Sequence, residues 1–167
     1  MNKTMHLSEH FTLGEVTKTS VKTTGENIPS HVAIENLKNL CENWLEELRY
    51  SNNVLYGDRE TRRQGDQDNT SEADMPIIIT SGYRSPEVNK AVGGSPTSNH
   101  LTGCAVDIRC EGFEQALRYA NILMDISDGT KRDYDELFVE RNKQGRYWIH
   151  FAVRPRDNRR RTAFIQT

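Results

Sequence analysis

The spacing of hydrophobic residues predicts two long helices. Ser30 is a good helix N-cap, and after it apolar residues recur at steps of three and four, the spacing of one buried helical face. This first stripe consists of Ile34, Leu37, Leu40, Cys41, Trp44, Leu45 and Leu48. A second stripe of the same period starts at Phe113 and runs to Met124, and Asp128-Gly129 ends it. Each stripe predicts an amphipathic helix that buries one face.

Short runs rich in β-branched and aromatic residues predict four strands. Residues 76–80 indicate a central strand buried on both faces, and residues 105–108 a second strand. Residues 137–140 and 147–153 flank the turn-forming residues 142–145, which predicts an antiparallel hairpin. The order of helix, two strands, helix and hairpin favours an α+β fold with a mainly antiparallel central sheet flanked by helices.

One polar stretch interrupts these elements. Residues 50–74 include Gly57 and Gly65 and have no sustained apolar period, so we expect an exposed loop or insertion there. The segments on both sides look like parts of one core, and 167 residues is the size of one ordinary domain. We therefore expect a single domain over residues 1–167 with an excursion at about 50–74.

Composition and charge exclude several classes of protein. With 35% hydrophobic residues at regular spacing the chain is not of the disordered class, and its net charge of -2 gives no general attraction to nucleic acid. The arginines among residues 154–161 form a local basic cluster that we interpret as a solvated tail. No stretch reaches the roughly 18 apolar residues of a membrane span, and the N-terminus has no apolar signal segment. We expect a cytoplasmic monomer without nucleic-acid or membrane partners.

Two histidines and an aspartate suggest a metal site. His100 and Asp107 lie seven residues apart around Gly103, which permits a tight turn, and His150 lies on the predicted last strand. Imidazole nitrogen and carboxylate oxygen suit zinc, and a catalytic zinc site uses three protein ligands. Considered alone, however, a neighbouring His and Asp form a hydrogen-bonded core pair more often than a metal site, and a half-buried strand histidine is ordinary.

A zinc hydrolase also needs a general base, and Glu140 is our candidate. If the hairpin pairs Glu140 with Trp148, then both side chains share a face with His150, because side-chain direction alternates along a strand. A shift of one residue would turn Glu140 to the wrong face. Glu136 and Asp135 are the alternatives, and each can equally be a solvent-facing carboxylate.

Arg84 follows the predicted strand at residues 76–80 in a loop. Its guanidinium can hold a substrate carboxylate through two parallel hydrogen bonds. The alternative is a surface ion pair with Glu87.

Several separate motifs resemble the zinc D-Ala-D-Ala carboxypeptidase and L,D-endopeptidase family, peptidase family M15, particularly its small single-domain members from bacteria and phages. The matching segments are an SxHxxGxAxD signature at residues 98–107, SGYRS at 81–85, a strand similar to FDQLIxE at 134–140, WxH at 148–150, and N-terminal segments at 11–15 and 37–49. The resemblance implies a hedgehog/D,D-peptidase-like fold with one Zn²⁺ ion. It implies that the zinc ligands are His100, Asp107 and His150, that Glu140 is the base, and that Arg84 and Ser98 contact the substrate or brace its carboxylate.

The function implied is hydrolysis of an amide bond next to a D-amino acid in peptidoglycan stem peptides or related short peptides. Many family members have an acidic residue three positions before the last histidine, where this chain has Tyr147, so the base must come from the preceding strand or be absent. Hedgehog signalling domains share the fold and a zinc site but are best known as binding proteins. The alternative is therefore a non-catalytic, zinc-stabilised cell-wall or peptide-binding module. Release to the cell wall as a phage-type lysis enzyme would reconcile the expected cytoplasmic location with a cell-wall substrate.

Overall fold

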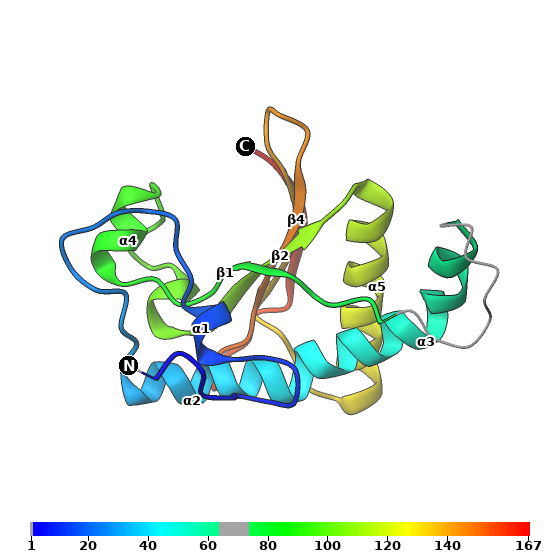
Figure 1. Cartoon of the computed structure of the whole chain (residues 1–167), viewed down its shortest axis with the longest axis horizontal. Coiled ribbons are helices and arrows are strands. Elements are labelled where there is room, and N and C mark those ends of the chain that lie inside the picture. Colours follow the sequence, from blue (N-terminus) through cyan, green and yellow to red (C-terminus); the bar gives the residue numbers. More distant parts are fainter. Residues whose placement is uncertain (1, 64–73) are drawn as a thin grey trace.

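The computed structural model describes residues 2–63 and 74–167 and confirms the predicted α+β class (Figure 1). Five strands form one sheet in the order β1-β2-β4-β3-β5. Every neighbouring pair is antiparallel except β3 and β5, which are parallel. The strands are β1 (Ile79–Ser81), β2 (Ala105–Cys110), β3 (Glu136–Arg141), β4 (Tyr147–Ala152) and β5 (Arg161–Gln166).

Both predicted long helices are present. Ser30 caps α2 (His31–Leu40) by accepting a 3.2 Å hydrogen bond from the Ala33 N–H. This helix continues through the π turn η1 (Cys41–Leu45) into α3 (Glu46–Arg63), so that one long rod crosses the molecule beside α5 (Phe113–Thr130) (Figure 1). Shorter helical segments are α1 (Leu13–Val16), α4 (Pro86–Ala91) and the 3₁₀ turn η2 (Asn99–Thr102).

The two faces of the sheet have different chemistry because side chains alternate along each strand. One face packs on the helices. There Trp44 of η1 lies with its ring centroid 5.1 Å from that of Phe151, and both side chains are buried. The other core residues of this face are Val106, Ile108, Leu137, Val139 and Ile149. The residues between them, which include Asp107 and His150, project from the opposite face, so the hydrophobic core fixes which side of the sheet is polar.

The prediction of a loop over residues 50–74 is wrong for residues 50–63. Residues 50–63 continue α3, and the remaining residues 64–73 lie outside the described part of the chain. This part of α3 has no apolar stripe in the sequence, because polar and cation–π contacts hold it in place instead of a buried hydrophobic face. Asn53 Oδ1 accepts a hydrogen bond of 3.1 Å from the Met75 N–H, and the Arg118 guanidinium of α5 lies 4.2 Å from the centroid of the Tyr56 ring.

The strand predicted at residues 76–80 is shorter than expected and lies at an edge. β1 pairs with β2 alone, and Ile78 is 45% exposed whereas Ile79 is buried. It was mistaken for a central strand because three consecutive isoleucines give an apolar run whether or not both faces are covered.

The fifth strand was not predicted at all. β5 pairs with β3, and Arg159, Arg160 and Arg161 form ion pairs, so this end of the arginine cluster is not the solvated tail that we expected, whereas Arg156 is exposed. Most side chains of β5 are exposed, and an exposed edge strand leaves no hydrophobic pattern in the sequence. Within the described residues, no helix has both the length and the apolar character needed to cross a membrane.

Candidate metal centre

The turn that carries His100 is shaped by its neighbours in the SxHxxGxAxD motif. Ser98 caps η2, with its Oγ accepting a 3.3 Å hydrogen bond from the His100 N–H. Gly103 ends the turn at a φ of +72°, and a Cβ there would lie 2.4 Å from the carbonyl oxygen of Ala33 in α2. Glycine is therefore required both by the left-handed backbone and by the close approach of α2.

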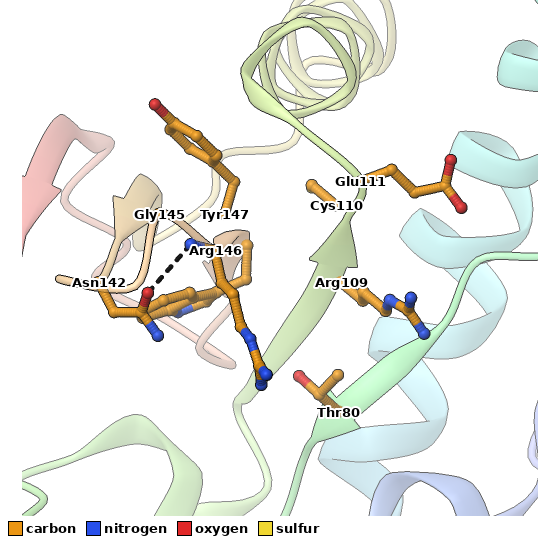
Figure 2. A pocket seen from close by; sticks show the side chains of 9 residues that line it. Thr80, Arg109, Cys110, Glu111, Asn142, Gly145, Arg146 and Tyr147 are labelled. Atoms are coloured by element: carbon orange, nitrogen blue, oxygen red, sulfur yellow. Dashed lines mark hydrogen bonds between the residues drawn. The ribbon is translucent and has the colours of Figure 1, made fainter.

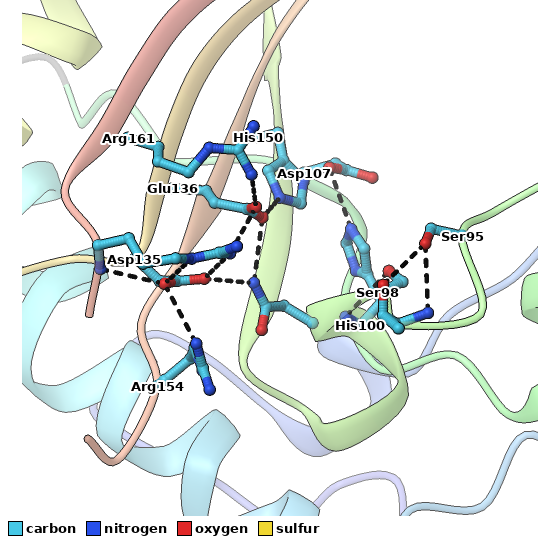
Figure 3. Close-up of polar contacts among 12 residues, drawn as sticks. Ser95, Ser98, His100, Asp107, Asp135, Glu136, His150, Arg154 and Arg161 are labelled. Carbon is cyan, nitrogen blue, oxygen red and sulfur yellow. Dashed lines mark hydrogen bonds and ion pairs between the residues drawn. The ribbon is translucent and has the colours of Figure 1, made fainter. Parts of the chain in front are cut away.

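The structure brings His100, Asp107 and His150 together (Figure 3). Asp107 on β2 and His150 on β4 are direct partners across the two strands. The Asp107 Oδ1 atom lies 3.3 Å from His100 Nε2 and 3.0 Å from His150 Nδ1. His100 and Asp107 are buried and His150 is half-buried. One ligand atom from each residue lies within 4.8 Å of the other two, which is the arrangement of a metal-binding cluster.

The hydrogen bonds on the far side of each imidazole fit this donor set to a metal ion. His100 Nδ1 lies 2.6 Å from the Gly82 carbonyl oxygen, which can only accept, so Nδ1 carries the proton. His150 Nε2 lies 3.2 Å from Glu136 Oε2, which favours a proton on that nitrogen. In the neutral rings, His100 Nε2 and His150 Nδ1 then direct lone pairs at Asp107, and an outer hydrogen bond of this kind is usual for metal-binding histidines.

Electrostatics in the centre are dominated by Asp107. Burial acts to raise the pKa of Asp107, but the charges and hydrogen bonds of His100 and His150 hold it far below its usual range. Burial likewise acts to lower the pKa of His150, but hydrogen bonds to Asp107 and Glu136 outweigh it and raise the pKa to about 9. Positive charge is therefore strongly favoured between these side chains, whether a proton or a metal ion supplies it.

Arg84 contacts a predicted metal ligand. Its Nη2 donates a 2.5 Å hydrogen bond to Asp107 Oδ2, and its Nε donates to Ser81 Oγ at 2.8 Å. The alternative ion pair with Glu87 is wrong, because that carboxylate accepts from the Gly25 N–H at 2.9 Å. The predicted contact of Arg84 with a substrate carboxylate stays a prediction, and its present contacts brace Asp107 instead. The same holds for Ser98, whose hydroxyl caps η2.

Glu140 lies in the register that its predicted role requires. It is the direct partner of Trp148, so both side chains lie on the face of the sheet that carries His150. Glu140 is half-buried, and burial raises its pKa, with a further upward contribution from the Asp107 charge and opposing contributions from His150 and Trp148. A carboxyl with a raised pKa beside the candidate metal centre suits a proton acceptor.

The two alternative bases have other partners. Asp135 is fully buried and accepts hydrogen bonds from Arg159 Nε at 2.8 Å and Nη2 at 2.6 Å (Figure 3). Glu136 accepts from Arg159 at 2.8 Å and Arg161 at 3.1 Å, and Asn99 donates to both carboxylates at 2.8 and 3.0 Å. This network was missed, because it joins Asn99 to acidic residues 36 and 37 positions away and to a C-terminal strand that has no hydrophobic pattern. The signal that could have found it is the opposite charge of the two segments.

Replacing Glu136 by alanine is expected to weaken metal binding about 10- to 100-fold, the usual effect of losing the outer hydrogen bond of a metal-binding histidine. Without Glu136, His150 is no longer held with Nδ1 toward Asp107. Competition titration with a chromogenic chelator measures the affinity. Glu42→Ala, which removes an exposed carboxylate from the long helix, is the control, and equal affinities for both variants would contradict this role of Glu136.

Comparison with known families agrees with this centre. The sequence profile of the family described as peptidase M15 matches residues 65–135, which include His100 and Asp107. This match supports an assignment to peptidase family M15. No curated protein matches the sequence. Such an assignment implies a hydrolase, and the cluster of His100, Asp107 and His150 could bind the metal ion on which M15 peptidases typically depend.

The family match ends before the hairpin formed by β3 and β4. His150 and Glu140 lie beyond residue 135, and the tertiary structure brings them to the matched segment through the pairing of β2, β4 and β3. The assignment thus covers two of the three predicted metal ligands. The third ligand and the predicted base rest on the observed register.

Proposed function

We propose that this protein is a zinc metallopeptidase that hydrolyses an amide bond next to a D-amino acid in peptidoglycan stem peptides or related short peptides. The observation that carries the proposal is the convergence of His100, Asp107 and His150, with Glu140 on the same face of the sheet. Two imidazoles and one carboxylate are a donor set of catalytic zinc sites, in which the fourth position stays open.

The chemistry divides between the metal and the side chains around it. His100, Asp107 and His150 would hold the zinc ion, which when bound would supply a Lewis acid for a carbonyl oxygen and would lower the pKa of water to about 7. Glu140 accepts the proton of the attacking water and passes it to the nitrogen of the leaving amine. Arg84 holds Asp107 by its second oxygen, which orients the carboxylate. The peptide bond is thereby exchanged for a carboxylate and a free amine.

The substrate class rests on the family assignment and on the SxHxxGxAxD and WxH motifs that surround the centre. A second function uses the same residues differently. In a non-catalytic peptide-binding module the metal would only stabilise the fold, and chelation would lower the melting temperature without loss of an activity.

One assay separates the two functions. We expect the purified protein to contain one zinc ion per chain and to cleave either D-Ala-D-Ala-ended peptides or L-Ala-D-Glu-containing muropeptides, with activity lost on chelation and restored by zinc. Products are identified by mass spectrometry, and His150→Ala is the metal-free control. Stoichiometric zinc without cleavage of any of these peptides would favour the binding module.

A further inference from the structure

A groove of about 770 Å³ lies at the hairpin end of the sheet (Figure 2). It is lined by Thr80 of β1, Arg109 at the end of β2, and the hairpin residues Asn142, Arg146 and Trp148. These residues come from three segments that surround the end of the β2–β4 pair. Of its lining residues only Trp148 belongs to one of the motifs noted in the sequence.

The groove is adjacent to the candidate metal centre. Arg109 and Trp148 are direct partners across β2 and β4, as are Asp107 and His150. Each lies two residues from its neighbour in the centre, so both pairs project from the same face, about 7 Å apart along the strands. Trp148 is also the cross-strand partner of Glu140, so one side chain borders both the groove and the predicted base.

The groove carries two guanidinium groups without partners. Arg109 and Arg146 are both exposed, and among the described residues neither side chain has an ion pair or a hydrogen bond. Figure 2 shows the Arg146 side chain extended toward Thr80. Glu111 also lines the groove, and its carboxylate lies on the other side of β2 in this view. On the opposite side of the centre the arginines do have partners. Arg159 forms an ion pair with Asp135, and Arg161 forms one with Glu136.

Arg84 is already hydrogen-bonded to Asp107, so a substrate carboxylate needs another cationic side chain. Arg84 uses Nη2 and Nε on Asp107 and Ser81. Arg109 and Arg146 are the unpaired guanidinium groups on the groove beside the centre, and guanidinium is the side chain best suited to carboxylate. The indole of Trp148 adds an apolar wall for the carbon chain that carries the acid.

We propose that Arg109 and Arg146 form a subsite for a second carboxylate of the substrate. This inference rests on the proposed peptidase function. An extended peptide advances about 3.3–3.6 Å per residue, so a separation of about 7 Å places the carboxylate about two residues from the scissile amide. The ligand class is therefore a short acidic peptide, with a side-chain or terminal carboxylate at that distance.

Two peptides that differ only in a carboxylate or a carboxamide two residues from the cleaved bond test the subsite. The wild-type protein should favour the acidic peptide about 10- to 100-fold in kcat/KM, through KM, because a charged hydrogen-bonding partner is lost in the amide. The double variant Arg109→Ala/Arg146→Ala should lose this preference while keeping its zinc and its kcat on the amide. Arg156→Ala, which removes an exposed arginine away from the groove, should behave as wild type.

The outcomes distinguish the subsite from the enzyme itself. Equal cleavage of both peptides by the wild type would overturn the subsite and leave the peptidase function intact. If neither peptide is cleaved, the peptidase function fails, and the subsite is then decided by calorimetric binding of the same two peptides to the zinc-loaded protein. Preferential binding of the acidic peptide that disappears in the double variant supports it, and equal binding overturns it. Melting temperatures check that both variants fold.

Discussion

Replacing Glu140 by glutamine is expected to lower kcat about 10²- to 10⁴-fold, the usual contribution of a general base. Glutamine has nearly the same shape but cannot accept the proton of the attacking water. Because Glu140 is not one of the three predicted ligands, the variant should retain one zinc ion per chain. Activity and metal content measured on one preparation therefore separate loss of the base from loss of the metal.

The pH profile provides a second readout for Glu140. Activity requires the ionised carboxylate, so it is lost as the pH falls through the pKa of Glu140. Burial raises this pKa, so the loss should begin at a higher pH than for an exposed glutamate. Glu47→Gln, at an exposed position of α3, is the matched control and should leave kcat and its pH profile unchanged. Full activity of Glu140→Gln would show that the base is misassigned.

Replacing Asp107 by asparagine is expected to abolish stoichiometric metal binding and also to destabilise the metal-free protein. The carboxylate is the common partner of His100, His150 and Arg84, and it is buried. Neutralising it leaves the Arg84 guanidinium, which is largely buried, without its counter-ion. Breaking a buried ion pair by removing one partner costs about 3–5 kcal/mol of the free energy of unfolding, and the partial exposure of Arg84 places this site at the lower end.

Urea unfolding in the presence of a chelator measures this stability without the metal. The pKa of Asp107 is lowered by folding, so its contribution to stability is present above the pKa of an ordinary carboxyl group and is lost as the pH falls through the lowered value. The difference between wild type and variant should therefore be complete at neutral pH and shrink in acid. Asp125→Asn removes an exposed carboxylate from α5 as a control. Unchanged metal content and unchanged unfolding at pH 7 would refute the central place of Asp107.

The hydrophobic pattern was sufficient to predict the elements that build the core. The stripe that ends at Leu48 and the stripe that begins at Phe113 formed helices, and the turn at residues 142–145 joined the predicted hairpin in the predicted register. The pattern failed where burial does not decide the structure. The second half of α3 is polar and β5 is mostly exposed, so neither leaves an apolar signal, whereas β1 has an apolar run that does not distinguish an edge strand from a central one.

For the candidate site, too, some features could be predicted from the sequence and others could not. Residue types and their motifs named His100, Asp107 and His150 as candidate ligands, and the two-residue period of a strand placed Glu140 on the face of His150 on the condition that Glu140 pairs with Trp148. The partners of Arg84, Glu136 and Asp135 were not predictable, since each depends on atoms brought from distant segments of the chain. Tertiary structure alone decided that Arg84 braces Asp107 and that Arg159 and Arg161 hold the Glu136 carboxylate that contacts His150. It also decided that Arg109 and Arg146 border one groove, because strand pairing and the hairpin bring their side chains to the same end of the sheet.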